Sequence, residues 1–160
     1  MANADPFPLS RALLEAVLED RTSDRFVCEL VWSRLGYQPG REALEGGTAL
    51  SWLAGPDTPG SWAAAFPQAP EVIAQRPASV ALTRSILGAH KQLLKQQLGF
   101  AGYRIGELYP RRTRRATAVN WLLAHLAERG EALPATGPLP PLLTPPLDPR
   151  FGHPGDPPVG

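Results

Sequence analysis

The chain has 160 residues, of which 43% are hydrophobic and 19% charged, and its formal net charge is +1. It has no run of about 18 apolar residues that would cross a membrane, and its N-terminus lacks the basic and apolar regions of a secretory signal. Cys28 is the only cysteine, which excludes an internal disulfide framework and a thiolate zinc site. These features predict a cytoplasmic protein with no membrane partner.

The distribution of proline predicts the domain organisation. Ten of the 19 prolines lie in residues 131–160, a density that neither a helix nor a central strand tolerates. We therefore predict a disordered, Pro-rich tail at 131–160 after a single globular domain at 1–130. Within that domain, residues 36–70 read as a long Gly/Pro-rich connection.

The N-terminal part of the chain predicts a helical hairpin. Apolar residues recur at helical spacing from Leu9 to Leu18, and Ser10 is suited to cap the first helix. A second apolar periodicity runs to Leu35, where Gly36 supplies a left-handed helix end.

The second half of the chain is also mainly helical. Residues 80–86 are compatible with a short strand or with a helix, and as a strand they would form a two-stranded ribbon with residues 103–108. A helix is expected at 89–98, and the clearest helix begins at Pro110 and ends before Gly130. The expected fold is a small, mainly α domain.

The near-zero net charge conceals a strong asymmetry. Residues 1–83 carry a net charge of −4, residues 84–115 carry +7 and residues 116–160 carry −2. Much of the positive charge sits in the first turn and a half of the last predicted helix, where cations oppose the helix dipole. The residues concerned are Arg111, Arg112, Arg114 and Arg115.

Two interpretations of these arginines remain open. They can pair internally with acids of the N-terminal hairpin, which are Glu15, Glu19, Asp20, Asp24 and Glu29. Alternatively they meet an anionic partner, and Arg114 then shares a helix face with Trp121 and His125. The leading hypothesis is a non-enzymatic interaction or adaptor protein that presents these six residues to an acidic protein surface.

Nucleic-acid binding is the alternative hypothesis for the same basic segment. Additional phosphate contacts would come from Arg84, Lys91, Lys95 and Arg104. The helix at 89–98, Gly99 and the arginine-bearing helix are similar in order to a bacterial helix-turn-helix, although about eleven residues separate the two helices here. The sequence pI of about 8.0 is low for a nucleic-acid-binding domain.

Catalytic and ligand-binding templates are missing from the sequence. The three histidines, His90, His125 and His153, have no metal-like spacing, and no nucleophile elbow or phosphate-binding loop occurs. We expect no enzymatic activity, no cofactor or metal, and no small-molecule substrate.

One segment carries a family resemblance. The run Pro-Arg-Arg-Thr-Arg-Arg-Ala-Thr-Ala-Val-Asn-Trp-Leu-Leu, which begins at Pro110 and follows Gly-Glu-Leu at 106–108, resembles a small cyanobacterial family built on a domain of unknown function. The likeness extends over about residues 10–127 and includes Leu-Val-Trp-x-x-Leu-Gly-Tyr at 30–37. It implies a cytosolic protein of a photosynthetic bacterium and assigns no functional residues.

Overall fold

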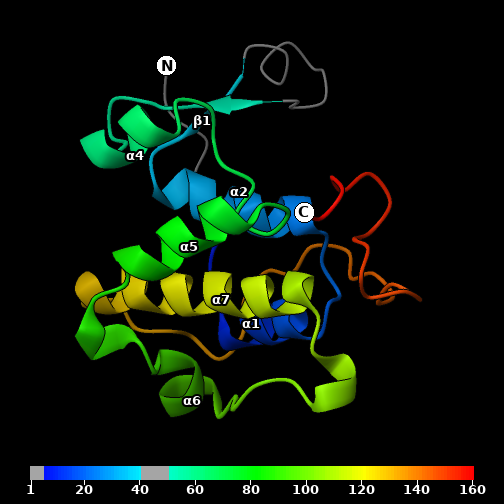
Figure 1. Cartoon of the computed structure of the whole chain (residues 1–160). Helices are drawn as coiled ribbons and strands as arrows, with labels where there is room; N and C mark the ends of the chain where they lie inside the picture. Colours follow the sequence, from blue (N-terminus) through cyan, green and yellow to red (C-terminus); the bar gives the residue numbers. More distant parts are fainter. Residues whose placement is uncertain (1–5, 41–50) are drawn as a thin grey trace. The chain divides into compact units, whose positions relative to one another are not determined.

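A computed structural model describes residues 6–40 and 51–160 of the chain (Figure 1). The described residues are mainly helical and include one two-stranded ribbon, which confirms the predicted fold class. The chain forms two compact units. One consists of Met1–Phe7 and Glu29–Pro70, and the other of Pro8–Cys28 and Glu71–Gly160.

Helix α7 (Pro110–Glu128) is the centre of the larger unit. Helices α1 (Arg11–Leu18), α5 (Arg76–Ser85) and α6 (Leu93–Leu98) all pack against it, as Figure 1 shows. Three large apolar residues of α7, at i, i+3 and i+4, explain this arrangement, because each of them is fully or almost fully buried. They are Val119, Leu122 and Leu123.

The predicted helix ends are confirmed at most boundaries. The Ser10 hydroxyl accepts the Leu13 backbone N–H at 3.1 Å and so caps α1. Gly99 has φ +66° and ends α6 in the left-handed conformation, and Gly130 has the same φ just after α7. Pro110 is the first residue of α7, as expected.

The helix predicted at 89–98 is divided in two. A 3-10 turn, η1 (Gly88–His90), comes first, and α6 follows from Leu93. The Asn120 side-chain oxygen accepts the Leu94 backbone N–H at 3.0 Å. An amide group from α7 therefore satisfies an N–H that the first turn of α6 leaves without a partner.

The ribbon predicted between residues 80–86 and 103–108 is wrong. Residues 80–85 belong to α5, and the other segment contains a 3-10 turn, η2 (Ile105–Glu107). The buried apolar positions of this part of the chain are Ala78, Leu82 and Ile86, spaced four apart as in a helix. This spacing is that of a helix, since a strand would direct every second residue to the same face.

The observed ribbon lies in the smaller unit. Strand β1 (Gln38–Pro39) pairs antiparallel with β2 (Trp52–Leu53), and helix α4 (Gly60–Ala65) follows. Both strands and α4 fall within the predicted connection at 36–70, of which residues 41–50 lie outside the described part.

Helix α2 (Asp24–Arg34) crosses from the larger unit into the smaller one at Glu29. Its end is fixed by Gly36, which has φ +85° and whose Cβ, if present, would lie 2.8 Å from the Asp57 carbonyl carbon. Trp32 of α2 packs against Trp52, with ring centroids 5.7 Å apart. The Trp32 indole N–H also donates to the Pro70 carbonyl at 2.7 Å.

The tail at 131–160 has no helix or strand, but its predicted disorder is not confirmed. The Pro134 carbonyl accepts the Arg11 backbone N–H at 2.8 Å, and the Arg21 carbonyl accepts the Leu143 N–H at 2.9 Å. Proline lacks an N–H but keeps its carbonyl, which here satisfies an N–H in the first turn of α1. Of the described helices, none is long and apolar enough to span a membrane.

Candidate functional site

The four arginines at the start of α7 have different surroundings. Arg111 and Arg115 are fully buried, the Arg112 side chain is 14% exposed, and Arg114 is half-buried. A buried guanidinium requires a counter-charge, because desolvation of an unpaired ion costs several kcal/mol.

Asp20 supplies that counter-charge to Arg111. Both terminal nitrogens of Arg111 donate to the Asp20 carboxylate, with Nη2–Oδ1 and Nη2–Oδ2 distances of 2.6 Å. Arg112 Nε donates to the same carboxylate at 3.2 Å, and His153 Nε2 of the tail lies 3.2 Å from Oδ1. Asp20 therefore lies at the centre of the charged cluster.

Asp24 is the counter-charge of Arg115. Arg115 Nη1 donates to Asp24 Oδ1 at 2.8 Å, and its other N–H groups donate to the Val17 carbonyl and the Thr22 hydroxyl. Burial raises the pKa of Asp24, against the opposing influence of Arg115 and Arg111. Burial likewise lowers the pKa of Arg111, although a guanidinium stays protonated in proteins.

The backbone of Asp20 is as unusual as its side chain. Its φ of +62° makes it the one non-glycine residue with positive φ in the described part of the chain. Asp is among the few residues that tolerate this conformation, which follows the end of α1 directly. The turn directs the carboxylate to the arginines of α7. We call Asp20, Asp24, Arg111 and Arg115 the buried ion cluster.

The buried ion cluster corrects the predicted partner surface. Arg111 and Arg115 are occupied inside the protein, so internal pairing with the N-terminal acids is the interpretation that the structure supports. Trp121 is 8% exposed and its indole N–H donates to the Ser85 hydroxyl at 3.1 Å, so it joins α7 to α5. His125 stacks beside Trp121 with ring centroids 5.4 Å apart.

Arg114 has a separate environment beside α5. Its Nη1 donates to the backbone oxygens of Ile73, Ala74 and Gly160 at 3.0, 3.2 and 2.9 Å. Burial, and to a lesser extent the nearby Arg76, lowers the pKa of Arg114. The positive charges of Arg76 and Arg114 therefore repel each other.

Arg114 lines a cavity of about 790 Å³ between α5 and α7, together with Arg76 and Arg84. We call it the arginine cavity. Its described lining contains no acidic residue, and the side chains of Arg76 and Arg84 form no ion pair within residues 6–40 and 51–160. Three guanidinium groups thus line one cavity whose described lining contains no acidic side chain.

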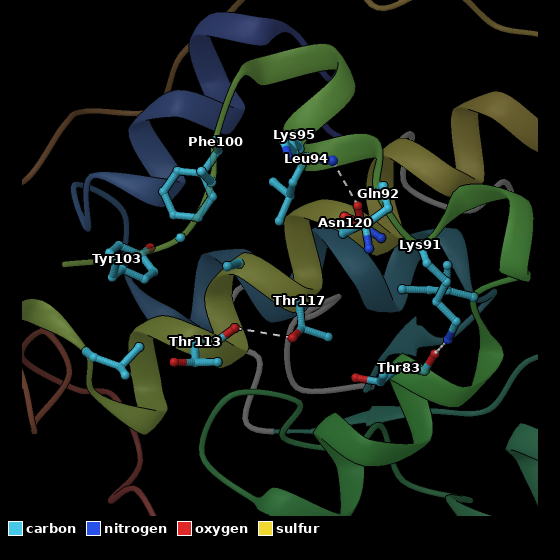
Figure 2. A pocket seen from close by; sticks show the side chains of 15 residues that line it. Thr83, Lys91, Gln92, Leu94, Lys95, Phe100, Tyr103, Thr113, Thr117 and Asn120 are labelled. Atoms are coloured by element: carbon cyan, nitrogen blue, oxygen red, sulfur yellow. Dashed lines mark hydrogen bonds between the residues drawn. The ribbon is translucent and has the colours of Figure 1, made fainter. Parts of the chain in front are cut away.

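A second cavity of about 480 Å³ lies between α7 and the segment that carries η1 and α6. We call it the lysine cavity, because Lys91 and Lys95 line it (Figure 2). Four additional residues were expected to contact nucleic acid. Of these, Arg84 lines the arginine cavity, whereas Lys91 and Lys95 line the lysine cavity. Arg104 is exposed and lines neither of them.

Comparison with known proteins identifies the family of this chain. Residues 8–127 match the family described as Domain of unknown function (DUF1823). The chain belongs to this family. A solved structure, titled as the solution NMR structure of a protein, is similar to the chain with 42% sequence identity and a TM-score of 0.62. The match covers 78% of this chain and 98% of the other. A search of curated proteins found no match.

The DUF1823 match contains the buried ion cluster and both cavities, but not the tail. Its range ends at residue 127, before His153 and Asp156. Asp156 accepts the backbone N–H groups of Asp24 and Arg25 at 2.8 and 3.1 Å, at the beginning of α2. The tail therefore adds contacts to the edge of a cluster that the DUF1823 domain already contains.

Sequence reasoning missed several residues of these cavities. Arg76 was not singled out, although it lies eight residues before Arg84 and so shares a face of α5 with it. Phe100 and Asn120 of the lysine cavity carried no signal, because α6 and α7 bring them together only in three dimensions. The described residues contain no group of three or more side chains suited to hold a metal ion.

Proposed function

We propose that this DUF1823 protein is a non-enzymatic interaction protein that binds an acidic segment of a partner protein in the arginine cavity. The observation that carries the proposal is the set of three guanidiniums, Arg76, Arg84 and Arg114, around a cavity without an acidic lining residue. The proposal keeps the acidic partner inferred from the sequence, and moves its site from the buried arginines to the cavity beside them.

The chemistry of the arginine cavity favours carboxylates. A guanidinium is a planar fork of N–H donors that matches a carboxylate with two parallel hydrogen bonds. Within the described part of the chain, only Nη1 of Arg114 donates hydrogen bonds, and it donates them to backbone oxygens. Its Nε and Nη2 groups therefore remain available to a ligand. Arg76 and Arg84 are exposed, so a partner reaches them without unfolding of the domain.

The shape of the site favours an extended segment. The residues of α5 that line the cavity include positions 76, 80 and 84, and those of α7 include positions 110, 114 and 117. Such spacings follow one face of each helix, so the cavity runs along the two helices. Several acidic side chains of one segment can therefore be bound in succession, which suits a peptide better than a single ion.

A nucleic acid is the competing occupant of this basic face. Guanidiniums also bind phosphate, and Lys91 and Lys95 lie near the arginine cavity, with which their own cavity shares Thr83, Thr113 and Thr117. The low pI and the acidic first half of the chain favour the protein partner. The arginine-rich run at 110–115 resembles that of a cyanobacterial family, and for this reason we place the interaction in the cytoplasm of a cyanobacterium.

The test measures binding of a fluorescent oligoglutamate peptide by anisotropy. We expect the Arg76→Ala/Arg84→Ala double variant to bind at least about tenfold more weakly than the unmodified protein, because charge-assisted hydrogen bonds are lost. Arg129→Ala is the matched control, since Arg129 is exposed and lies beyond both cavities. Equal binding by all three proteins, or a preference for oligothymidylate over the peptide, would contradict the proposal.

A further inference from the structure

The lysine cavity has a property that composition alone does not explain. The chain contains only two lysines among its 16 basic residues, and both of them, Lys91 and Lys95, line this one cavity. They are the only charged residues in its described lining. The described lining of the cavity therefore carries two positive charges and no carboxylate.

Figure 2 shows that the walls of the lysine cavity differ in chemistry. Phe100 and Tyr103 lie on one side of the cavity and Lys91 on the opposite side, where it reaches Thr83, and Lys95 lies between them beside Leu94. The two aromatic rings pack edge to face with centroids 5.0 Å apart. The lining thus combines two cationic side chains with an aromatic pair on one side.

The threonines that line the cavity do not add hydrogen-bond donors. Each of their hydroxyl groups donates to a backbone carbonyl one turn earlier in its own helix, at 3.1 to 3.2 Å. The three are Thr83, Thr113 and Thr117. The charged donors offered to a ligand are therefore the two ammonium groups, and Lys91 already uses one proton on the Thr83 carbonyl at 2.6 Å.

The walls are held in place before any ligand enters. Asn120 is buried and bridges the Leu94 N–H and the His90 carbonyl, at 3.0 and 3.1 Å. The Tyr103 hydroxyl donates to the Leu18 carbonyl at 2.9 Å, and the Phe100 N–H donates to the Leu94 carbonyl at 3.1 Å. A ligand binding here orders few side chains, which lowers the entropic cost of binding.

We infer that the lysine cavity binds a small organic carboxylate whose apolar or aromatic body packs against Phe100 and Tyr103. The carboxylate would pair with the ammonium group of Lys95, and Lys91 would add a second positive charge to the same lining. A volume of about 480 Å³ is within the range of small-molecule sites, which are mostly apolar with a few polar groups that orient the ligand. Ammonium groups also bind phosphate, so an aromatic phosphate is the competing ligand that the test includes.

This site is distinct in chemistry from the arginine cavity. The two share Thr83, Leu108, Thr113 and Thr117, but none of the cationic side chains belongs to both. A small carboxylate and an acidic peptide segment can therefore be tested separately. Failure of one leaves the other standing.

The scarcity of lysine makes the site accessible to experiment. Reductive ¹³C-methylation of the full chain keeps the positive charge and labels Lys91, Lys95 and the α-amino group. We would titrate this protein with indole-3-acetate, with the neutral indole-3-acetamide and with phenyl phosphate. The NMR signals of the two dimethyl-lysines are followed, and the α-amino signal is the internal control.

We expect indole-3-acetate to shift both lysine signals in a saturable way, with a Kd of about 1 mM or lower. The neutral amide should bind at least about tenfold more weakly, and Lys95→Gln should weaken the acetate to a similar extent while Arg129→Gln does not. Equal binding of acid and amide, shifts that do not saturate, or tighter binding of phenyl phosphate would overturn the inference.

Discussion

Arg111 and Asp20 lie 91 positions apart in the chain and form a fully buried pair in which two guanidinium nitrogens face one carboxylate. The pair joins the first turn of α7 to the turn after α1. It explains why arginines occupy a helix N-terminus, where the helix dipole disfavours them. Asp20 and Asp24 neutralise that end of α7, so the unfavourable placement of positive charge is offset inside the protein.

Removal of one member of the Arg111–Asp20 pair should be strongly destabilising. We expect Arg111→Met to lower the free energy of unfolding by about 3–5 kcal/mol, because Asp20 is left buried without its main partner. Urea unfolding followed by circular dichroism measures the change. Arg129→Met, at an exposed position, is the control and should alter stability by less than about 0.5 kcal/mol. An equal, small effect of both substitutions would show that the pair is not needed for stability.

The tail should depend on Asp156, which accepts two backbone N–H groups at the start of α2. We expect Asp156→Asn to cost about 1 kcal/mol and to speed hydrogen exchange at the Asp24 and Arg25 amides. Gly152→Ala should have a similar effect, because a Cβ at this position would lie 2.7 Å from the Asp156 side chain. Gly155→Ala provides a control for crowding, since no atom lies within 4 Å of its Cβ position, although its φ of +90° adds local strain. Unchanged exchange at both amides in Asp156→Asn would contradict this account of the tail.

Two tyrosines should ionise late. Burial raises the pKa of Tyr37 and of Tyr103 to about 12. The folded protein then holds the phenol proton more tightly than the unfolded chain, in which the pKa is about 10. Stability should be unaffected below pH 10 by these groups and should fall as the pH rises from about 10 to about 12. Absorbance of tyrosinate measures the titration, and full ionisation of all three tyrosines near pH 10 in the folded protein would contradict it.

The buried thiol of Cys28 should be unreactive. Desolvation and the nearby Glu71 raise its pKa well above the usual value, and its Sγ lies 3.9 Å from Glu71 Oε1. Because the thiolate is the reactive form, we expect labelling by a disulfide reagent to be slow in the folded protein and fast in denaturant. Rapid labelling without unfolding would show that the thiol is accessible.

The helices of this protein were largely predictable, because their signals are local. The Ser10 cap, the left-handed Gly99 and the apolar face of α7 all appear in short stretches of sequence. The division of the helix predicted at 89–98 into η1 and α6 was not predictable. The Leu94 N–H at the start of α6 is bound by Asn120, which lies 26 positions further along the chain. The tail likewise forms backbone hydrogen bonds with residues that lie far away in the sequence, and local sequence patterns do not reveal such contacts.

The candidate site was predicted only in part. The sequence named the four arginines at the start of α7, and Asp20 and Asp24 were among their possible internal partners. The choice between internal pairing and an external partner requires knowledge of which side chains are buried. The sequence indicated arginines and lysines of one basic segment as candidate binding residues, but it did not assign them to different sites. Their division into a cavity with three arginines and a cavity with two lysines arises from the packing of α5 and α6 on α7.

The most direct test of the proposed function maps where an acidic segment binds. A ¹⁵N-labelled sample is titrated with oligoglutamate, and amide shifts are compared between the unmodified protein and Arg76→Ala/Arg84→Ala. We predict saturable shifts along the faces of α5 and α7 that line the arginine cavity, and their loss in the double variant. Shifts that persist in that variant, or that lie on other elements, would contradict the claim that this cavity is the binding site.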